Sequence, residues 1–276
     1  MRFFAVLHSS SIALAILLMG AAHSDSTALH AQGQPEKSAA KTITVDEGTD
    51  LAVAVSPDHT TIVMDLQGML YSIPVAGGHA TRITDSMAEA SHPSWSPKGD
   101  RIAFQSYMGG TFHIWTMKPD GSELKQITFG HGDDREPSFS LDGRTIAFAS
   151  DRAFKGSYDI WTVDVRSGAL KQWTSAESDE YEPAWSADGK EITFVSGTGA
   201  VGKTIESVNP TGTRHTEASI EDDGRLEAPS WSPDGKTLAY VRFFGTGLFM
   251  NSARLMLKGG PVDALRSEDA FPFAAS

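Results

Sequence analysis

The stretch HPSWSPKGDRIAFQS (residues 92–106) decides the fold of this 276-residue chain, because similar stretches return along it. Three strong copies are EPSFSLDGRTIAFAS (136–150), EPAWSADGKEITFVS (182–196) and APSWSPDGKTLAYVR (228–242), and a weaker first copy is LAVAVSPDHTTIVMD (51–65). The serine that all five copies share recurs at spacings of 40, 44, 46 and 46 residues. A regular period of this length indicates supersecondary units that stack on one another.

Each copy predicts a turn between two strands. The segment S-P-D-G places Pro at the first corner of the turn, where its fixed φ is suitable, and Gly where a positive φ is needed. Apolar residues then alternate, as at Ile102 and Phe104, which predicts a strand with one buried face. Third and fourth strands follow, for example at HIWTM (113–117) and LKQIT (124–128). The unit is therefore a four-stranded antiparallel sheet.

Such units predict an all-β protein, a β-propeller of four-stranded antiparallel blades with five repeats. A β-sandwich is the alternative, but it does not require successive units to look alike. We expect residues 41–45 to form a closing strand and residues 267–276 to begin a further blade, as in an incomplete six-bladed ring. The five predicted blades span approximately residues 51–85, 92–129, 136–175, 182–219 and 229–266.

The pattern xPxWSPDGxxIAFxS…IWTMxxDGxxLxQIT resembles the TolB-type propeller repeat over residues 42 to about 266. This repeat occurs in exported TolB proteins of the Tol envelope system and as an accessory domain of prolyl-oligopeptidase-like peptidases and secreted amidohydrolases. The resemblance implies either an exported non-catalytic propeller that binds an envelope protein, such as a peptidoglycan-associated lipoprotein, or the N-terminal module of a longer secreted hydrolase. The leader is too short for the N-terminal α/β domain of TolB proteins, which leaves both readings open.

The N-terminal residues predict export. Arg2 is followed by an apolar run, and Ala22-His23-Ser24 provides a small-x-small cleavage site, so residues 1–24 are expected to be a signal peptide and residues 25–40 a flexible leader. No second apolar run follows, so we expect no membrane span after cleavage and a periplasmic or secreted location. The chain has no cysteine, which excludes disulfides and thiolate metal sites.

Several function classes find no support in the sequence. GTGAVGKT (197–204) fits the phosphate-loop pattern, but the residues after it align with a strand instead of a helix, so we interpret it as a hairpin loop. The net charge of −12 and the scattered Lys and Arg residues argue against nucleic-acid binding. No G-x-S-x-G, H-x-H or H-E-x-x-H motif occurs, so no catalytic residue, metal site or cofactor is expected.

The candidate site consists of charged loops directly before three of the first strands. If these strands are innermost, the loops meet at one mouth of the central channel and form a negative rim that two arginines and a tyrosine interrupt. Such a rim would bind a basic protein partner, although polar loops are also simply soluble. The candidate residues are Asp133, Asp134, Arg135, Glu136, Asp179, Glu180, Tyr181, Glu182, Asp222, Asp223, Arg225 and Glu227.

Overall fold

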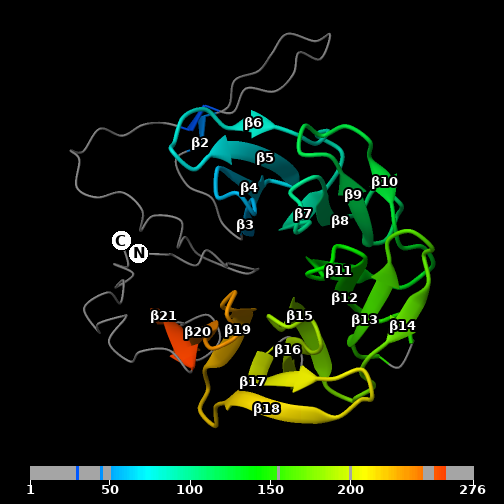
Figure 1. Cartoon of the computed structure of the whole chain (residues 1–276), viewed down its shortest axis with the longest axis vertical. Coiled ribbons are helices and arrows are strands. Elements are labelled where there is room, and N and C mark those ends of the chain that lie inside the picture. The colour runs from blue at the N-terminus through cyan, green and yellow to red at the C-terminus, as the bar shows by residue number, and fades with distance from the viewer. Residues whose placement is uncertain are drawn as a thin grey trace.

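The computed structural model describes residues 29–30, 44–45, 51–153, 156–198, 201–244 and 252–258. Five antiparallel sheets stand side by side around a central axis in chain order, which confirms the predicted propeller (Figure 1). No helix occurs among the described residues, and so none that could cross a membrane is found in them. The predicted signal peptide and the predicted start of a further blade lie outside the described residues.

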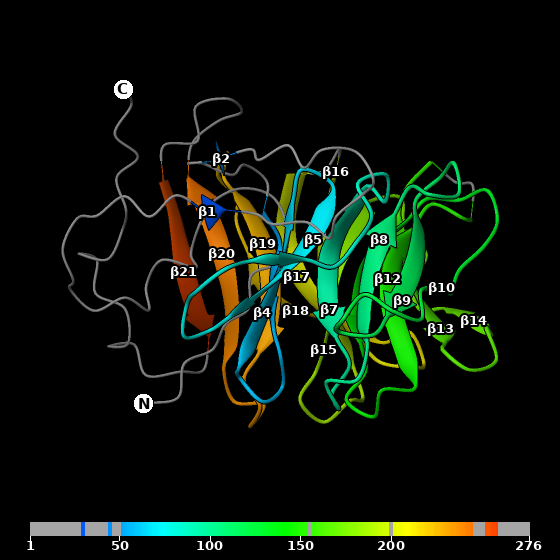
Figure 2. The same cartoon turned by 90° about the horizontal axis from the view of Figure 1, so that it is seen from above.

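The strands of each blade follow one another from the axis outward (Figure 1), and they run roughly along that axis (Figure 2). Blade 1 contains β3 (Val53–Val55), β4 (Thr61–Leu66), β5 (Met69–Pro74) and β6 (Thr81–Arg82). Blade 2 contains β7 (Ala90–Trp95), β8 (Ile102–Ser106), β9 (His113–Met117) and β10 (Lys125–Gln126). Blade 3 contains β11 (Asp134–Phe139), β12 (Thr145–Ser150), β13 (Asp159–Asp164) and β14 (Leu170–Gln172).

Blade 4 contains β15 (Asp179–Trp185), β16 (Ile192–Thr198), β17 (Val201–Val208) and β18 (Arg214–Ser219). Blade 5 has three described strands, β19 (Arg225–Trp231), β20 (Leu238–Phe244) and β21 (Ser252–Lys258). The first strands of blades 2 to 5 begin two to four residues before the predicted blade starts, because each strand continues past the repeated segment into residues that differ between the copies.

The predicted closing strand overlaps β2 (Thr44–Val45), which pairs antiparallel with β1 (Leu29–His30). Packing joins every blade to the next from blade 1 to blade 5. Among the described strands, no comparable packing joins β21 to β3. Closure of the ring by residues 41–45 and the presence of a sixth blade therefore stay predictions.

The shared serine holds the turn of each blade. In blade 3, Ser140 Oγ accepts the amide N–H of Thr145 (3.0 Å) and donates to Asp142 Oδ1 (2.7 Å). The amide of Gly143, whose φ is 68° as the turn requires, donates to the Ser140 carbonyl (2.9 Å). In blade 1, His59 takes the place of this glycine with a φ of 61°. The repeated serine is therefore structural.

In blades 2 to 5, one aromatic residue at the same repeat position, Trp95, Phe139, Trp185 or Trp231, ends the first strand. Trp95 packs against the core shared by blades 1 and 2 and donates its indole N–H to a carbonyl of blade 1 (3.2 Å). Trp185 donates in the same way to the Ser138 carbonyl of blade 3 (3.1 Å), and Trp231 donates to the Thr193 hydroxyl of blade 4 (2.7 Å). These side chains connect the blades and need no ligand to explain them.

The GTGAVGKT segment is part of a hairpin in blade 4. β16 and β17 pair antiparallel, with Gly197 opposite Gly202. Lys203 Nζ donates to the carbonyl oxygens of Asp222 and Gly224, each at 2.7 Å, so this lysine ties the hairpin to blade 5. Because β17 is a strand, the segment lacks the helix N-terminus on which a phosphate loop depends.

Candidate functional site

The twelve candidate residues lie at the starts of three innermost strands or in the loops directly before them. β11, β15 and β19 face the axis in Figure 1. The amide of Asp134 donates to the Phe112 carbonyl of the preceding blade, and the amide of Glu180 donates in the same way to the Tyr158 carbonyl, each at 2.8 Å. Equivalent backbone links in consecutive blades bring the strand starts to the same end of the channel, which we call the mouth.

Asp134 is fully buried and is surrounded by donors. Arg152 Nη2 lies 2.6 and 2.5 Å from its two carboxylate oxygens, Ser150 Oγ donates to Oδ1 (2.6 Å), and His113 Nδ1 lies 3.3 Å from Oδ2. Burial alone would raise the pKa of Asp134, but His113, Arg152 and Ser150 together hold it below its usual value. Asp134 therefore joins blade 3 to blade 2 as a buried anion.

Glu180 occupies the equivalent position in blade 4 with weaker support. It is fully buried, and Arg214 Nη1 lies 2.5 Å from its Oε1. Burial raises the pKa of Glu180, and the nearby carboxylate of Asp159 adds to the rise, against the opposing effects of Thr174 and Arg214. The surroundings thus favour the charged form of Asp134 in blade 3 and disfavour the charged form of Glu180 at the same position in blade 4.

Each first strand from blade 2 to blade 5 has a bulge at the residue before its proline. The pairing register shifts there, and φ lies between 53° and 55° at His92, Glu136, Glu182 and Ala228. A non-glycine residue rarely adopts such a φ, and the bulge turns its amide toward the preceding blade.

A side chain of the preceding blade accepts each of these amides. The four bonds are His92 N to Asp65 Oδ2 (2.9 Å), Glu136 N to Gln105 Oε1 (2.8 Å), Glu182 N to Glu136 Oε2 (2.6 Å) and Ala228 N to Glu182 Oε2 (2.6 Å). Glu136 and Glu182 are therefore both bulge residues and acceptors, and they link blades 3, 4 and 5 around the channel. Burial raises the pKa of Glu136, against the opposing effects of the Glu182 amide and Arg135.

Tyr181 marks the centre of the acidic cluster. Burial raises its pKa strongly, and the carboxylates of Glu182, Glu227 and Glu136 add to the rise, while Arg225 opposes it. Glu227 is itself buried and pairs with Arg225, whose Nε lies 2.5 Å from Glu227 Oε1. Carboxylates from blades 3, 4 and 5 therefore act on Tyr181 and favour its neutral phenol form.

The remaining candidate residues are the ones that solvent reaches. Asp133 accepts the amide of Phe112 (3.0 Å) and pairs with Arg135 (3.0 Å), whose guanidinium lies over the Phe112 ring. Asp222 pairs with Arg242 at 2.5 Å. Asp179 is half-buried, and its Oδ1 accepts the Tyr158 amide (3.1 Å), while Asp223 is exposed.

The expected rim of carboxylates, which two arginines and a tyrosine interrupt, lies only partly at the surface. Asp134, Glu180, Glu182 and Glu227 are buried and bonded inside the protein, so they do not form an exposed surface. Arginines further along the chain neutralise three of the carboxylates at the mouth, namely Arg152, Arg214 and Arg242. Sequence inspection missed these partners because they lie 18, 34 and 20 residues from the acids that they bind.

The accessible mouth consequently has mixed charge. Its exposed or half-buried members among the candidates are Asp133, Arg135, Glu136, Asp179, Tyr181, Asp222, Asp223 and Arg225. Within the described part of the chain, no group of three or more His, Asp or Glu side chains is arranged to hold a metal ion. The chemistry available at this surface is charge pairing and hydrogen bonding.

Known proteins with similar sequences and folds agree with this architecture. The Tol-Pal system protein TolB of Wolbachia sp. subsp. Drosophila simulans (strain wRi) is 46% identical over 50 residues, which are 18% of this chain and 12% of that protein's length. A putative TolB from Agrobacterium tumefaciens has a similar fold, with a TM-score of 0.66 at 21% identity, covering 79% of this chain and 80% of that one. A puromycin hydrolase variant is also similar in fold, with a TM-score of 0.54 at 16% identity, covering 78% of this chain and 38% of the hydrolase.

The family match extends over most of the propeller. The model of the TolB beta propeller domain matches residues 33–153 and 109–250, two overlapping segments that include all of blades 1 to 4 and all of β19 and β20. The segments that carry the repeated turns and the inter-blade aromatics lie within this match. The chain therefore belongs to the TolB beta propeller domain family.

Proposed function

We propose that this chain is an exported, non-catalytic propeller that binds a protein partner in the cell envelope through the mouth of its channel. The name of the Wolbachia relative places that protein in the Tol-Pal system, which supports an envelope partner and a periplasmic location. The predicted signal peptide of residues 1–24 agrees with this location.

The structural observation that carries this proposal is that some carboxylates at the mouth are buried while others are accessible to solvent. Four carboxylates are used internally, whereas Asp133, Asp179, Asp222 and Asp223 remain within reach of solvent beside Arg135 and Arg225. Complementary charges give specificity and speed to protein association more than they give affinity. A partner with both basic and acidic side chains on its contact surface would match this arrangement.

The test is recovery of a partner from envelope extract by the full chain and by the variant Asp222→Asn/Asp223→Asn/Arg135→Gln. These changes leave the buried pairs of Asp134, Glu180 and Glu227 intact. A matched control is Asp188→Asn/Asp234→Asn, which neutralises two exposed acids on the turns of blades 4 and 5. We expect the mouth variant to lose about tenfold in partner recovery, since three exposed charges that each contribute up to about 1 kcal/mol to a contact together reach the roughly 1.4 kcal/mol of a tenfold change. Equal recovery by both variants contradicts the proposal.

A second candidate function is that of a propeller module in a longer secreted amidohydrolase or peptidase. The observation that favours it is the fold similarity to a part of the puromycin hydrolase variant. Sequencing the gene beyond the codon for Ser276 tests it, since an in-frame hydrolase domain there is the expected result and its absence the contrary one.

A further inference from the structure

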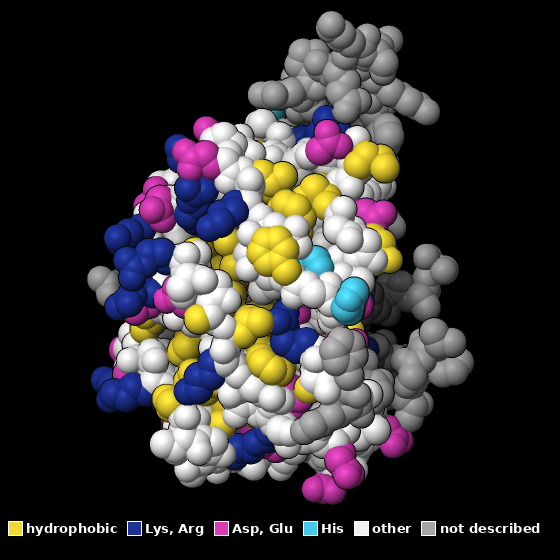
Figure 3. Space-filling view, turned by 90° about the vertical axis from the view of Figure 1, so that its right-hand side faces the viewer, with side chains coloured by type: hydrophobic (Ala, Val, Ile, Leu, Met, Phe, Trp, Pro, Cys, Tyr) yellow, Lys and Arg dark blue, Asp and Glu magenta, His cyan; other side chains and the backbone are white. Residues whose placement is uncertain are grey.

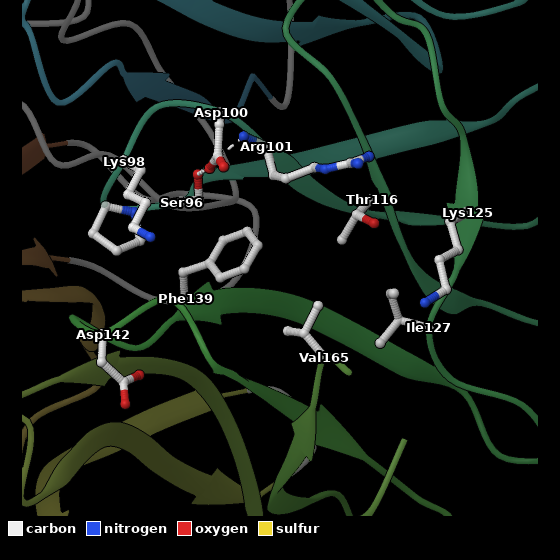
Figure 4. Close-up of a pocket in the computed structure, with 12 residues that line it drawn as sticks. Ser96, Lys98, Asp100, Arg101, Thr116, Lys125, Ile127, Phe139, Asp142 and Val165 are labelled. Atoms are coloured by element: carbon white, nitrogen blue, oxygen red, sulfur yellow. Dashed lines mark hydrogen bonds between the residues drawn. The ribbon is translucent and has the colours of Figure 1, made fainter. Parts of the chain in front are cut away.

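A cavity of about 230 Å³ lies between blades 2 and 3, on the side of the repeated turns (Figure 4). Phe139, Ile127 and Val165 form its apolar walls, and Lys98 and Lys125 stand at its edges. Phe139 comes from the first strand of blade 3, and Ile127 directly follows the last strand of blade 2. The cavity is therefore a gap in the packing between two blades.

The repeat explains why the gap occurs at this junction. The position of Phe139 is held by Trp95, Trp185 and Trp231 in the other blades, and Phe is the smaller side chain. At the junction of blades 3 and 4, Trp185 meets Trp173 edge to face, with ring centroids 5.7 Å apart and planes at 87°. Ile127 stands where Trp173 does, so the junction of blades 2 and 3 has neither indole ring.

Lys98 is a second departure from the repeat. In blades 1, 3, 4 and 5 an aspartate holds this turn position and accepts a bond from the turn serine; these residues are Asp58, Asp142, Asp188 and Asp234. In blade 2 the acceptor for Ser96 Oγ is Asp100 instead (2.8 Å). The turn of blade 2 therefore does not use the side chain of residue 98 as an acceptor, and this position carries a lysine.

Lys125 also lacks the partners of its counterpart. In blade 3, Lys171 lies 4.5 Å from the centroid of the Trp173 ring and donates to the Pro210 carbonyl (3.2 Å). Lys125 has Ile127 in place of that ring, and neither Lys98 nor Lys125 forms an ion pair within the described ranges.

The other charged side chains at the cavity are already engaged. Asp100 and Asp142 accept bonds from their own turn serines, and Arg101 pairs with Glu123. Lys and Arg side chains gather beside hydrophobic ones along one side of the face that blades 2 and 3 present in Figure 3. In a chain with a net charge of −12, two lysines without an ion-pair partner among the described residues stand at opposite ends of a cavity with apolar walls, which favours an anion with an apolar body.

We propose that this cavity binds a flat aromatic carboxylate. The ring would take the space that corresponds to the one an indole fills at the junction of blades 3 and 4, and the carboxylate would be attracted by Lys98 and Lys125, which stand at opposite ends of the cavity. The volume suits one ring system of about indole size, well below that of a drug-sized ligand. Both the ring and the carboxylate are needed, because the apolar walls and the two cations each recognise one of them.

The test uses indole-3-acetate as the probe, followed by methyl NMR shifts of Ile127 and Val165 in the full chain. Indole, which lacks the carboxylate, and acetate, which lacks the ring, are the matched ligands. We expect indole-3-acetate to bind at least about tenfold more tightly than either, since loss of one good charge pair or of one buried ring is worth that much. Equal binding of all three probes, or shifts confined to methyl groups elsewhere, overturns the proposal.

Phe139→Trp provides the decisive variant. Trp fits this position in three other blades, and its indole N–H would meet the Ser94 carbonyl as that of Trp185 meets the Ser138 carbonyl. The variant is expected to fold, to melt no lower than the parent and to lose binding of indole-3-acetate by at least about tenfold, because its own ring fills the cavity. Unchanged binding by this variant refutes the assignment.

Charge variants test the rim without altering the cavity walls. Lys98→Gln and Lys125→Gln are each expected to weaken indole-3-acetate several-fold and to leave indole unaffected, whereas Lys236→Gln on the turn of blade 5 is expected to change neither. A peptide that ends in a free C-terminal Trp, compared with its amide, distinguishes a chain terminus from a free small molecule as the source of the same chemistry. Equal effects of the three lysine variants contradict the proposed rim.

Discussion

The two ends of the blades are built in different ways. At the turn end, blades 3, 4 and 5 repeat the same bonds from serine to aspartate, from the glycine amide to the serine carbonyl, and from a later amide to the serine hydroxyl. At the mouth, equivalent positions are satisfied differently, since Asp134 has Arg152 and His113 while Glu180 has Arg214 and faces Asp159. The repeat therefore determines the blades and the spacing between them, whereas the side chains that bond to equivalent residues at the mouth differ from blade to blade.

The largest expected effect comes from breaking the mouth at its most buried ion pair. Asp134→Ala leaves Arg152 and His113 without their shared carboxylate, and loss of one partner of a buried pair typically costs about 3–5 kcal/mol. Urea denaturation followed by tryptophan fluorescence measures the change in the free energy of unfolding.

The control for this prediction is Lys118→Ala, which breaks an exposed pair with Glu123. Exposed pairs contribute about 0–1 kcal/mol, so this variant should unfold close to the parent. If Asp134→Ala and Lys118→Ala lower stability equally, the buried network does not hold the mouth together.

A smaller effect is expected at the turn end, where two glycines separate backbone strain from packing. Gly143 and Gly189 have φ of 68° and 69°, but a Cβ at Gly143 would lie 3.3 Å from Pro97 of the preceding blade, whereas one at Gly189 would meet nothing within 4 Å. An Ala residue at such a φ costs about 1–2 kcal/mol from strain alone. We expect Gly189→Ala to lose this much and Gly143→Ala somewhat more, as measured by urea denaturation.

The two glycine variants also show whether adjacent turns pack as rigidly as their bonds suggest. A Gly143→Ala variant as stable as Gly189→Ala would mean that Pro97 moves away from the added methyl group with no loss in the free energy of unfolding. In that case the turns of neighbouring blades are independent, and the inter-blade aromatics and the bonds at the mouth connect the sheets.

The sequence predicts the turn end well, because every signal there is local. Ser140 and Gly143 are three residues apart and bond to each other, and the alternation that follows them gives strand and face directly. The same reasoning identified GTGAVGKT as a hairpin loop. The repetition of these local signals then predicts the overall architecture, because similar units bury their apolar faces by stacking on one another.

The mouth was harder to predict because its partners are distant in sequence. Nothing in the loop before β11 shows that Arg152 pairs with Asp134. Carboxylates that are buried and paired with an arginine therefore could not be distinguished from carboxylates exposed to solvent. Pro93, Pro137, Pro183 and Pro229 recur at one repeat position, but the residue before a proline ordinarily favours extended backbone with a negative φ. The recurring prolines therefore do not predict the positive φ of the bulges.

The smallest expected effect is a change in the pH dependence of stability through Glu136. Burial raises its pKa, so between the unfolded and folded values the folded chain binds more protons than the unfolded one. The free energy of unfolding therefore has a component that falls as pH rises through this window. Asp134 contributes with the opposite sign, because its pKa is lowered and its stabilisation is lost as pH falls.

Glu136→Gln keeps an oxygen that accepts the Glu182 amide but removes the titrating proton. We expect it to match the parent near pH 4 and to become the more stable of the two as pH rises toward 8, with Glu177→Gln, which removes an exposed carboxylate, as the control. Urea midpoints measured at a series of pH values decide the matter. Parallel curves of urea midpoint against pH for the parent and Glu136→Gln would contradict the prediction. They would mean that the pKa of Glu136 is the same in the folded and the unfolded chain.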